Sequence, residues 1–265
     1  MKSIDVVIPI FNEEQIVKEL IFRLQKATSD LNYQFKFILV DDGSTDDTLK
    51  HLLTLQRSEP RLDVIKLSRN WGHQNAYNAG LDHSTGDALI FMDGDLEDPP
   101  ELFPEFIAKW EEGNEVVYAV KNSRQRTRFE KITFSLFYKL LHRFSEVSVD
   151  QQAGMFSLIG KKVANELKKW SEKNKFYVGL RFFMGFKQAR INYHREKRFA
   201  GEPKQTFRRL FNYGLNAFFS FSFLPIRILT YLGLFLILTI VILGTLFIIG
   251  KTTIISTAFF EQIRN

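Results

Sequence analysis

Short apolar runs alternate with amphipathic stretches through the first half of the chain. Four runs are nearly continuously apolar, as in strands buried on both faces of a parallel sheet, and cover residues 4–10, 35–40, 64–67 and 88–92. Three stretches between them carry apolar residues at helical spacing, over residues 13–28, 45–57 and 74–83. Ser44 followed by Asp47 has the composition of a helix start, with a hydroxyl cap and an acid in the first turn. The alternation predicts an α/β domain with a mostly parallel sheet.

The pattern is less regular beyond residue 92. Three prolines mark a loop that leads into a helix ending at Glu112; they are Pro99, Pro100 and Pro104. Residues 116–120 predict another strand, and residues 190–194 have the composition of a further one. Residues 129–144 are helix-like, basic and aromatic. We assign residues 1–200 to one α/β domain.

Residues 228–250 contain no charged side chain. A helix of these 23 residues is about 35 Å long, and a hydrocarbon core is about 30 Å thick. The alternative, a helix buried in a soluble core, is rarely so long and so uniformly apolar. We predict a transmembrane helix and short tail at residues 227–265. Residues 201–226 are basic at first and then rich in Phe, which predicts an amphipathic segment at the membrane interface.

Basic residues are more numerous before this transmembrane segment than after it. Those before it are Lys204, Arg208, Arg209 and Arg227, and those after it are Lys251 and Arg264. The cytoplasmic flanks of membrane helices carry the excess of Lys and Arg. The sequence therefore predicts a protein of the cell (inner) membrane whose N-terminal domain lies in the cytoplasm.

The net charge of +6 is spread unevenly over the 265 residues. Residues 121–144 hold seven basic residues and one acid, and residues 187–209 hold eight and two, so these stretches carry +12 and the remainder about −6. Such a basic band indicates an anionic partner: nucleic acid, a phosphorylated ligand or a membrane surface. The chain has no cysteine, which excludes a disulfide scaffold, a Cys-ligated metal and a thiol nucleophile.

Polar residues collect directly after each of the first four predicted strands. The first strand runs into Pro9, Phe11, Asn12 and Glu13, the second into Asp41, Asp42, Gly43 and Ser44, the third into Ser68, Arg69 and Asn70, and the fourth into Asp93, Gly94 and Asp95. In open parallel sheets, ligands bind at the carboxyl ends of the strands. The four clusters therefore predict a single binding site.

Asp93 and Asp95 flank a glycine on the turn after the fourth strand. Two carboxylates so placed can hold a hard cation such as Mg²⁺, which binds few carboxylates and takes substrate phosphates as further ligands. Such a metal would neutralise a diphosphate leaving group. Glu97 is either a third ligand or an exposed loop acid. Of the pair Asp41 and Asp42, we expect one to cap the next helix and the other to accept hydrogen bonds from a base or ribose.

Several other site motifs are absent from the sequence. No G-x-G-x-x-G follows the first strand, which leaves dinucleotide binding unsupported. The five His residues form no H-E-x-x-H pair, and there is no G-x-S-x-G elbow. Nucleic-acid binding would account for the basic band, but for neither the apolar segment nor the acidic clusters, so we expect no nucleic-acid partner.

Three motifs together resemble the family-two glycosyltransferases of GT-A fold. They are Val6-Val7-Ile8-Pro9-Ile10-Phe11-Asn12-Glu13-Glu14, Val40-Asp41-Asp42-Gly43-Ser44-Thr45-Asp46 and Phe91-Met92-Asp93-Gly94-Asp95-Leu96-Glu97-Asp98-Pro99-Pro100-Glu101. Residues 68–72 and 79–80 also match in order and spacing, so the resemblance covers about residues 4–101. The subgroup that it resembles most is the polyprenyl-phosphate glycosyltransferases, which include dolichol-phosphate mannose synthases and bacterial undecaprenyl-phosphate enzymes.

The resemblance implies a nucleotide-diphosphate-sugar donor, a divalent cation (Mg²⁺ or Mn²⁺) at Asp93 and Asp95, and transfer with inversion. It also implies which positions bind the nucleotide sugar: Pro9, Phe11, Asn12, Glu13, Asp41, Asp42, Asn70, Gly72 and Asp93. Asp95 is then the first of the catalytic candidates.

The sequence departs from the family pattern near Phe156. Relatives usually carry an acid four residues before the matching Phe and an Arg directly after it, whereas these positions here hold Gln152 and Ser157. Asp150 lies close to the first position but out of register, and it is a second catalytic candidate.

A polyprenyl phosphate is an anion near neutral pH and hardly needs a general base. It does need cations that hold it in line with the anomeric carbon. Arg124, Arg126 and Arg128 beside a Phe-rich stretch suit that task, and the alternative is a solvated charged face. We predict a membrane-anchored, metal-dependent, inverting glycosyltransferase that moves a sugar from a nucleotide diphosphate to a polyprenyl phosphate.

Two other functions stay compatible with the sequence. One is transfer to a saccharide or a lipid-linked glycan, and the other is non-catalytic binding of nucleotide sugars by a membrane protein. The sequence names neither the sugar nor the nucleotide, and it allows a homo-oligomer without requiring one.

Overall fold

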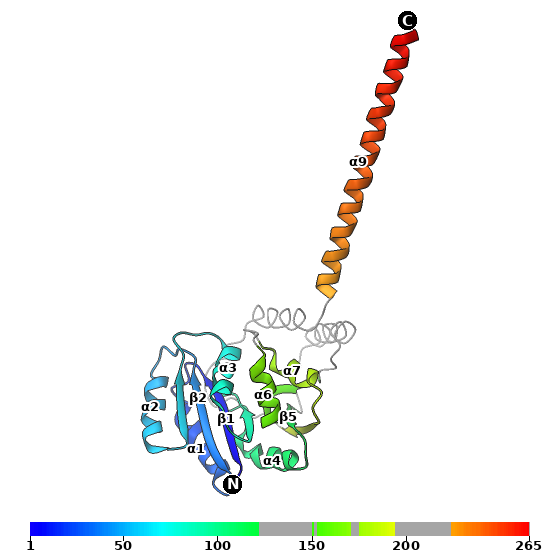
Figure 1. Cartoon of the computed structure of the whole chain (residues 1–265). Helices are drawn as coiled ribbons and strands as arrows, with labels where there is room; N and C mark the ends of the chain where they lie inside the picture. The colour runs from blue at the N-terminus through cyan, green and yellow to red at the C-terminus, as the bar shows by residue number, and fades with distance from the viewer. Residues whose placement is uncertain (122–149, 151–152, 171–174, 194–223, 265) are drawn as a thin grey trace. The chain divides into compact units, whose positions relative to one another are not determined.

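The computed structural model of the chain describes residues 1–121, 150, 153–170, 175–193 and 224–264, drawn in colour in Figure 1. The chain divides into two compact units, Met1–Phe221 and Ser222–Asn265. Several predicted features lie outside the described residues: the helix-like stretch 129–144, the cations Arg124, Arg126 and Arg128, Gln152, and most of the segment 201–226. These features stay predictions.

The described part of the first unit is built on a seven-stranded sheet with the order β3-β2-β1-β4-β6-β5-β7. The strands are β1 (Ser3–Ile10), β2 (Gln34–Asp41), β3 (Leu62–Lys66), β4 (Ala88–Phe91), β5 (Val116–Lys121), β6 (Ala153–Gly160) and β7 (Gln188–Tyr193). β1 pairs in parallel with β2 and β4, β2 with β3, and β5 with β7. Among the described strands, β6 alone runs against its neighbours. The predicted mostly parallel sheet is confirmed.

The strand that the apolar pattern missed is β6. Its sequence, AGMFSLIG, interrupts the apolar residues with Gly and Ser, which are poor strand formers. It is nevertheless held on both sides, by β4 and by β5. Tertiary pairing therefore supplies what the local pattern of this segment lacks.

The helices cover both faces of the sheet, which gives three layers. They are α1 (Val17–Thr28), α2 (Thr48–Ser58), α3 (His73–His83), α4 (Phe103–Glu111), α6 (Lys161–Lys169) and α7 (Tyr177–Phe183), with a 3-10 turn, η1 (Pro100–Leu102), before α4. Apolar residues of α1, α2 and α4 pack on one face, and those of α3, α6 and α7 on the other. From β1 to β5, strands and helices alternate along the chain as predicted.

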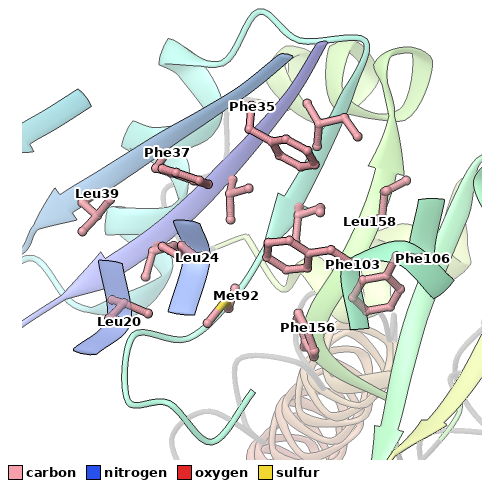
Figure 2. Close-up of a cluster of buried hydrophobic side chains, with 14 of the residues drawn as sticks. Leu20, Leu24, Phe35, Phe37, Leu39, Met92, Phe103, Phe106, Phe156 and Leu158 are labelled. Carbon is pink, nitrogen blue, oxygen red and sulfur yellow. The ribbon is translucent and has the colours of Figure 1, made fainter. Parts of the chain in front are cut away.

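Burial on both faces explains why the predicted strands are continuously apolar. In β1, Ile8 packs with α1 and α4, and Val7, beside it in the chain, packs with α3 on the opposite face. Figure 2 shows the first cluster, where Leu24 of α1 and Phe103 of α4 lie among aromatic side chains of the sheet. A fully buried side chain of this kind contributes about 1.5–3 kcal/mol. The core therefore fixes the positions at which the strands end.

Two helix starts differ from the prediction. α2 begins at Thr48 behind Asp47, which makes no side-chain capping hydrogen bond. Ser44, predicted as the cap, instead accepts a hydrogen bond from the Asn12 N–H at 3.0 Å. α1 begins at Val17 and not at residue 13, because Asn12 has a left-handed backbone (φ 52°) that turns the chain first.

The described part of the second unit is one long helix, α9 (Leu224–Arg264). Its segment Ile226–Lys251 has a mean hydropathy of 2.9, and none of it is buried. It is long and apolar enough to cross a membrane, and it contains the predicted segment 228–250. A helix in a soluble core would have buried side chains instead.

Candidate active site

The four polar clusters lie at one edge of the sheet. Ile10 pairs with Asp41 and Asp41 with Lys66, so the carboxyl ends of β1, β2 and β3 are level. β4 pairs with β1 on the other side and ends at Phe91, opposite Val7. Side chains that follow these strands in the sequence are therefore neighbours in space.

Asn12 and Glu13 join the loop after β1 to the loop after β2. Asn12 Oδ1 accepts a hydrogen bond from the Thr45 N–H at 2.8 Å, and the Glu13 N–H donates to Thr48 Oγ1 at 2.9 Å. Phe11, directly before them, is half-buried. These residues brace the edge of the sheet at which nucleotide binding is predicted.

Asp41 and Asp42 differ in their surroundings. Asp41 is fully buried; its Oδ1 accepts from the Ser44 N–H at 3.3 Å, and its Oδ2 has no hydrogen-bond partner among the described residues. Asp42 accepts from the N–H groups of Trp71 at 2.7 Å and Gly72 at 2.9 Å. Burial raises the pKa of Asp42, against the lowering effect of these two donors. Neither carboxylate caps α2, so the expected helix cap is wrong, and the expected acceptor for a base or ribose stays a prediction.

The loop after β3 closes against the turn after β2. A Cβ on Gly43 (φ 71°) would lie 2.4 Å from the Arg69 carbonyl carbon and 2.7 Å from Asn70 N, so glycine is required at this approach. Asn70 and Trp71 are exposed, and the Arg69 guanidinium lies 3.8 Å from the centre of the Trp71 ring. Asn70 and Gly72 therefore border the same edge of the sheet as Asp42.

His73 and Tyr77 of α3 both reach the Asp93 carboxylate. His73 Nε2 lies 2.9 Å, and the Tyr77 hydroxyl 2.6 Å, from Asp93 Oδ1. Burial and the Asp93 charge raise the pKa of Tyr77, which therefore stays a donor. Burial disfavours the charged form of His73, but the nearby carboxylates, Asp93 first, outweigh it and raise its pKa. The first two turns of α3 thus hold one oxygen of Asp93.

Sequence reasoning missed these two residues. The signal that could have found them is their spacing, because residues four apart lie on one face of a helix. His73 also directly follows Gly72, at the end of a stretch already placed at the site.

The turn after β4 packs tightly on the end of β1. A Cβ on Gly94 would lie 2.4 Å from Ile10 Cδ1 and 3.0 Å from the Pro9 carbonyl oxygen, so a larger residue there would displace the Ile10 side chain. The Asp95 carboxylate accepts a hydrogen bond from the Glu97 N–H at 3.1 Å. Pro9 therefore lies at the base of the turn, and Asp95 is oriented within it.

Asp93 and Asp95 supply the hard oxygen donors that Mg²⁺ and Mn²⁺ prefer, and both are partly exposed. Within the described residues, no group of three or more His, Asp or Glu side chains is placed to hold a metal. This donor set fits a cation that takes its remaining ligands from diphosphate and water. A third ligand at Glu97 stays a prediction.

Asp150 lies beside side chains of β5 and β7. Its Oδ2 accepts a hydrogen bond from the Tyr118 hydroxyl at 3.4 Å and is 3.6 Å from the Arg190 guanidinium. Burial and then the Asp150 charge raise the pKa of Tyr118. The catalytic role of Asp150 stays a prediction, as do the roles of the three cations outside the described residues.

A buried arginine reaches Ser157 from α7. Arg181 is 1% exposed, and its guanidinium donates to the Ser157 hydroxyl, to the Gly154 carbonyl at 2.6 Å and to the Met155 carbonyl at 3.4 Å. The family pattern expects an arginine at position 157 itself, and here a guanidinium reaches the same strand from another element. No feature of the sequence predicts this contact, because a lone arginine is rarely fully buried.

The chain matches the family model described as glycosyl transferase family 2 over residues 5–168. It is 39% identical over 232 residues to an uncharacterized glycosyltransferase of Synechocystis sp., which covers 87% of this chain and 73% of the relative. It is 34% identical over 260 residues to the bactoprenol glucosyl transferase of Shigella phage SfX, which covers 97% of this chain and 83% of the relative.

Solved structures show the same fold at low sequence identity. One is the glucosyl-3-phosphoglycerate synthase of Mycobacterium tuberculosis in complex with Mg²⁺ and UDP, with a TM-score of 0.54, 19% identity and coverage of 76% of this chain and 73% of that one. Another is a mannosyltransferase of Pyrobaculum calidifontis in complex with GDP-Man and Mn²⁺, with a TM-score of 0.51, 17% identity and coverage of 72% and 55%.

Proposed function

The chain belongs to glycosyl transferase family 2, and from that premise we propose that it moves a sugar from a nucleotide diphosphate to a polyprenyl phosphate at a membrane surface. Relatives named bactoprenol glucosyl transferase support this acceptor class, because the match to one of them covers 97% of this chain. The apolar segment Ile226–Lys251 supports an acceptor that resides in a membrane.

The observation that carries the proposal is the set of acids gathered at the carboxyl edge of the sheet. Asp41 presents a buried oxygen without a partner among the described residues, which suits an N–H or O–H group of the nucleoside. Asp42 orders the loop that borders the same edge. Asp93 and Asp95 would hold Mg²⁺ or Mn²⁺, which when bound would neutralise the departing diphosphate.

The proposed reaction is a displacement at the anomeric carbon. An oxygen of the polyprenyl phosphate forms the new bond, while the bond from that carbon to the donor diphosphate breaks and the nucleoside diphosphate leaves with the electron pair. A phosphate that is already ionised needs no base to remove a proton. The task of the chain is therefore to align the reactants, which we assign to Arg124, Arg126 and Arg128 on the acceptor side.

We further propose that the catalytic unit lies at the cytoplasmic face of the inner membrane. The basis is the excess of basic residues before Ile226–Lys251 over those after it. Labelling of residues on either side of this segment in intact and permeabilised cells tests the orientation.

The decisive experiment is a transfer assay with the full-length chain purified in detergent. It is incubated with a panel of nucleotide sugars, Mn²⁺ or Mg²⁺, and polyprenyl phosphate as the sole acceptor, and the lipid is analysed by mass. We expect one glycosyl phosphate lipid, which disappears when EDTA replaces the metal. Product only with an added saccharide or lipid-linked glycan supports the other acceptor class. Donor binding without turnover supports a non-catalytic role, and either result contradicts the proposal.

A further inference from the structure

The turn at residues 93–98 is held in an unusual backbone conformation. Leu96 has φ 61°, in the left-handed region that L residues other than Asn and Asp seldom adopt. Its side chain is 1% exposed and belongs to the apolar cluster under the sheet. A conformation of this kind is unfavourable and persists only where surrounding structure enforces it. The question is which groups enforce it.

Asp98 closes the turn on itself. This carboxylate is 2% exposed, and its Oδ2 accepts a hydrogen bond from the Asp93 N–H at 3.4 Å. Its Oδ1 accepts a hydrogen bond from the Tyr193 hydroxyl at 2.7 Å. The buried Asp98 side chain thus connects Asp93, the first residue of the turn, with Tyr193, which lies 95 positions after Asp98 in the sequence.

Tyr193 is the last residue of β7, which is separated from β4 by β6 and β5 in the sheet. Its side chain is 4% exposed and packs beside Phe156, whose ring centre lies 5.9 Å from that of Tyr193. Burial, with the Asp98 charge, raises the pKa of Tyr193, so its hydroxyl remains a donor to Asp98. The far edge of the sheet therefore reaches the turn through one hydrogen bond.

We propose that Tyr193 and Asp98 are positioning residues, which act through the Asp93 backbone to set the geometry of turn 93–98. The inference rests on the proposed function, in which Asp93 and Asp95 of this turn hold the divalent cation. Residues behind the ligands of a metal typically change its affinity by about 10–100-fold when altered. Loss of the Tyr193 hydroxyl should therefore weaken metal binding without removing a ligand.

The test compares Tyr193→Phe with Tyr33→Phe in the full-length chain. Tyr33 is a matched control, because its hydroxyl also bonds a carboxylate, Glu111, and because it directly precedes β2, at the amino ends of the strands and not at the carboxyl ends where turn 93–98 lies. We measure Mn²⁺ binding by electron paramagnetic resonance with UDP or GDP present, the Mn²⁺ concentration for half-maximal transfer, and the melting temperature. The binding measurement requires no turnover.

We expect Tyr193→Phe to weaken Mn²⁺ binding by about tenfold, and the control to leave it within twofold of wild type. At saturating Mn²⁺, transfer by Tyr193→Phe should return to within about threefold of wild type, since both proposed ligands remain. Asp98→Asn should weaken binding at least as much, and adding Tyr193→Phe to it should have little further effect because the two act as a unit.

Mn²⁺ binding by Tyr193→Phe equal to that of the control would overturn the proposal, even if both variants melt at a lower temperature. A wild-type chain that binds no Mn²⁺ with either nucleotide overturns it too. Failure of the proposed function looks different: Mn²⁺ still binds, and Tyr193→Phe still weakens it, but polyprenyl phosphate gains no sugar.

Discussion

The two halves of the sheet use polar side chains in opposite ways. In the half formed by β1 to β4, acids follow the strands and gather at one edge, where several remain partly exposed. In the half formed by β5, β6 and β7, two polar groups are buried and bonded within the chain: Arg181 to Ser157, and Tyr193 to Asp98. We infer that the first half presents chemical groups and that the second half fixes their positions. Substitutions of the acids at the carboxyl edge of the first half should therefore change catalysis directly, whereas substitutions of the buried polar groups of the second half should change stability or act on the site through its geometry.

The largest effect is expected for Asp95→Asn, which removes a proposed metal ligand from a turn without touching the core. Loss of the several kcal/mol that a bound cation contributes corresponds to a fall in turnover of about 10²–10³-fold or more. The melting temperature should stay unchanged. The control is Asp63→Asn, which changes a partly exposed acid of β3 that is paired with Lys36 of β2, and it should keep full activity. Near-normal turnover of Asp95→Asn with metal present would exclude the metal assignment.

The second prediction concerns Arg181→Met, in the other half. It leaves buried acceptors on β6 without their donor, which should cost roughly 2–4 kcal/mol and lower the melting temperature by about 5–15 °C. A reciprocal exchange, Ser157→Arg with Arg181→Ser, returns a guanidinium to the same strand and should recover at least half of this loss. If the exchange is no more stable than Arg181→Ser alone, the guanidinium does not stabilise β6 by donating hydrogen bonds to its buried acceptors.

A smaller effect is expected for Asp42→Ala, in the first half. The carboxylate orders the loop at Trp71 and Gly72, so its loss should raise the KM for the donor by about tenfold and change kcat by less than threefold. Steady-state kinetics with the donor varied at saturating acceptor decide the matter. A large fall in kcat at an unchanged donor KM would contradict a role in donor binding.

The smallest effect is expected for Glu59→Gln. Glu59 lies between α2 and β3 in the first half, at the amino end of β3 and away from the carboxyl edge. Hydrogen bonds from Arg61, and then Gln25, outweigh desolvation and lower the pKa of Glu59 from 4.5 to about 2. The carboxylate therefore stabilises the fold above about pH 4.5, and this contribution is lost as the pH falls toward 2. The variant should lose about 1 kcal/mol at pH 7 and less than half of that near pH 3, because the folded carboxylate is still largely ionised there, with no change in transfer. Unfolding at both pH values measures this; an equal deficit at both contradicts it.

The same contrast explains what could be predicted from the sequence. β1, β2 and β4 are buried on both faces and β3 is partly buried, so each appears in the sequence as an apolar run. The acids after them could be placed at one edge by topology alone. Gly43 confirms that edge, because the backbone of Arg69 and Asn70 leaves no room for a Cβ there. The positions of the clusters follow from local patterns, whereas their hydrogen bonds do not.

The second half could not be predicted in this way. β6 contains Gly and Ser, which hide its strand character. Arg181 lies in a short helix, where the sequence predicts that a charged side chain is exposed. Tyr193 and Asp98 meet only because β7 and the turn after β4 are brought together by the sheet. A hydrogen bond between segments so distant in the sequence produces no periodic pattern of residues from which it could be predicted.

The position of β6 between β4 and β5 has a consequence for the order in which the protein is made. A nascent chain can pair β1 to β4 as soon as residue 91 is available, but β5 then has no described partner until β6 follows it at Ala153–Gly160. During that interval the free edge of β4 offers unpaired backbone groups to other chains. The sheet is complete at Tyr193, before Leu224 begins the apolar helix α9. Synthesis from the N-terminus therefore allows the sheet of the catalytic unit to form before α9, the most hydrophobic segment of the chain, leaves the ribosome.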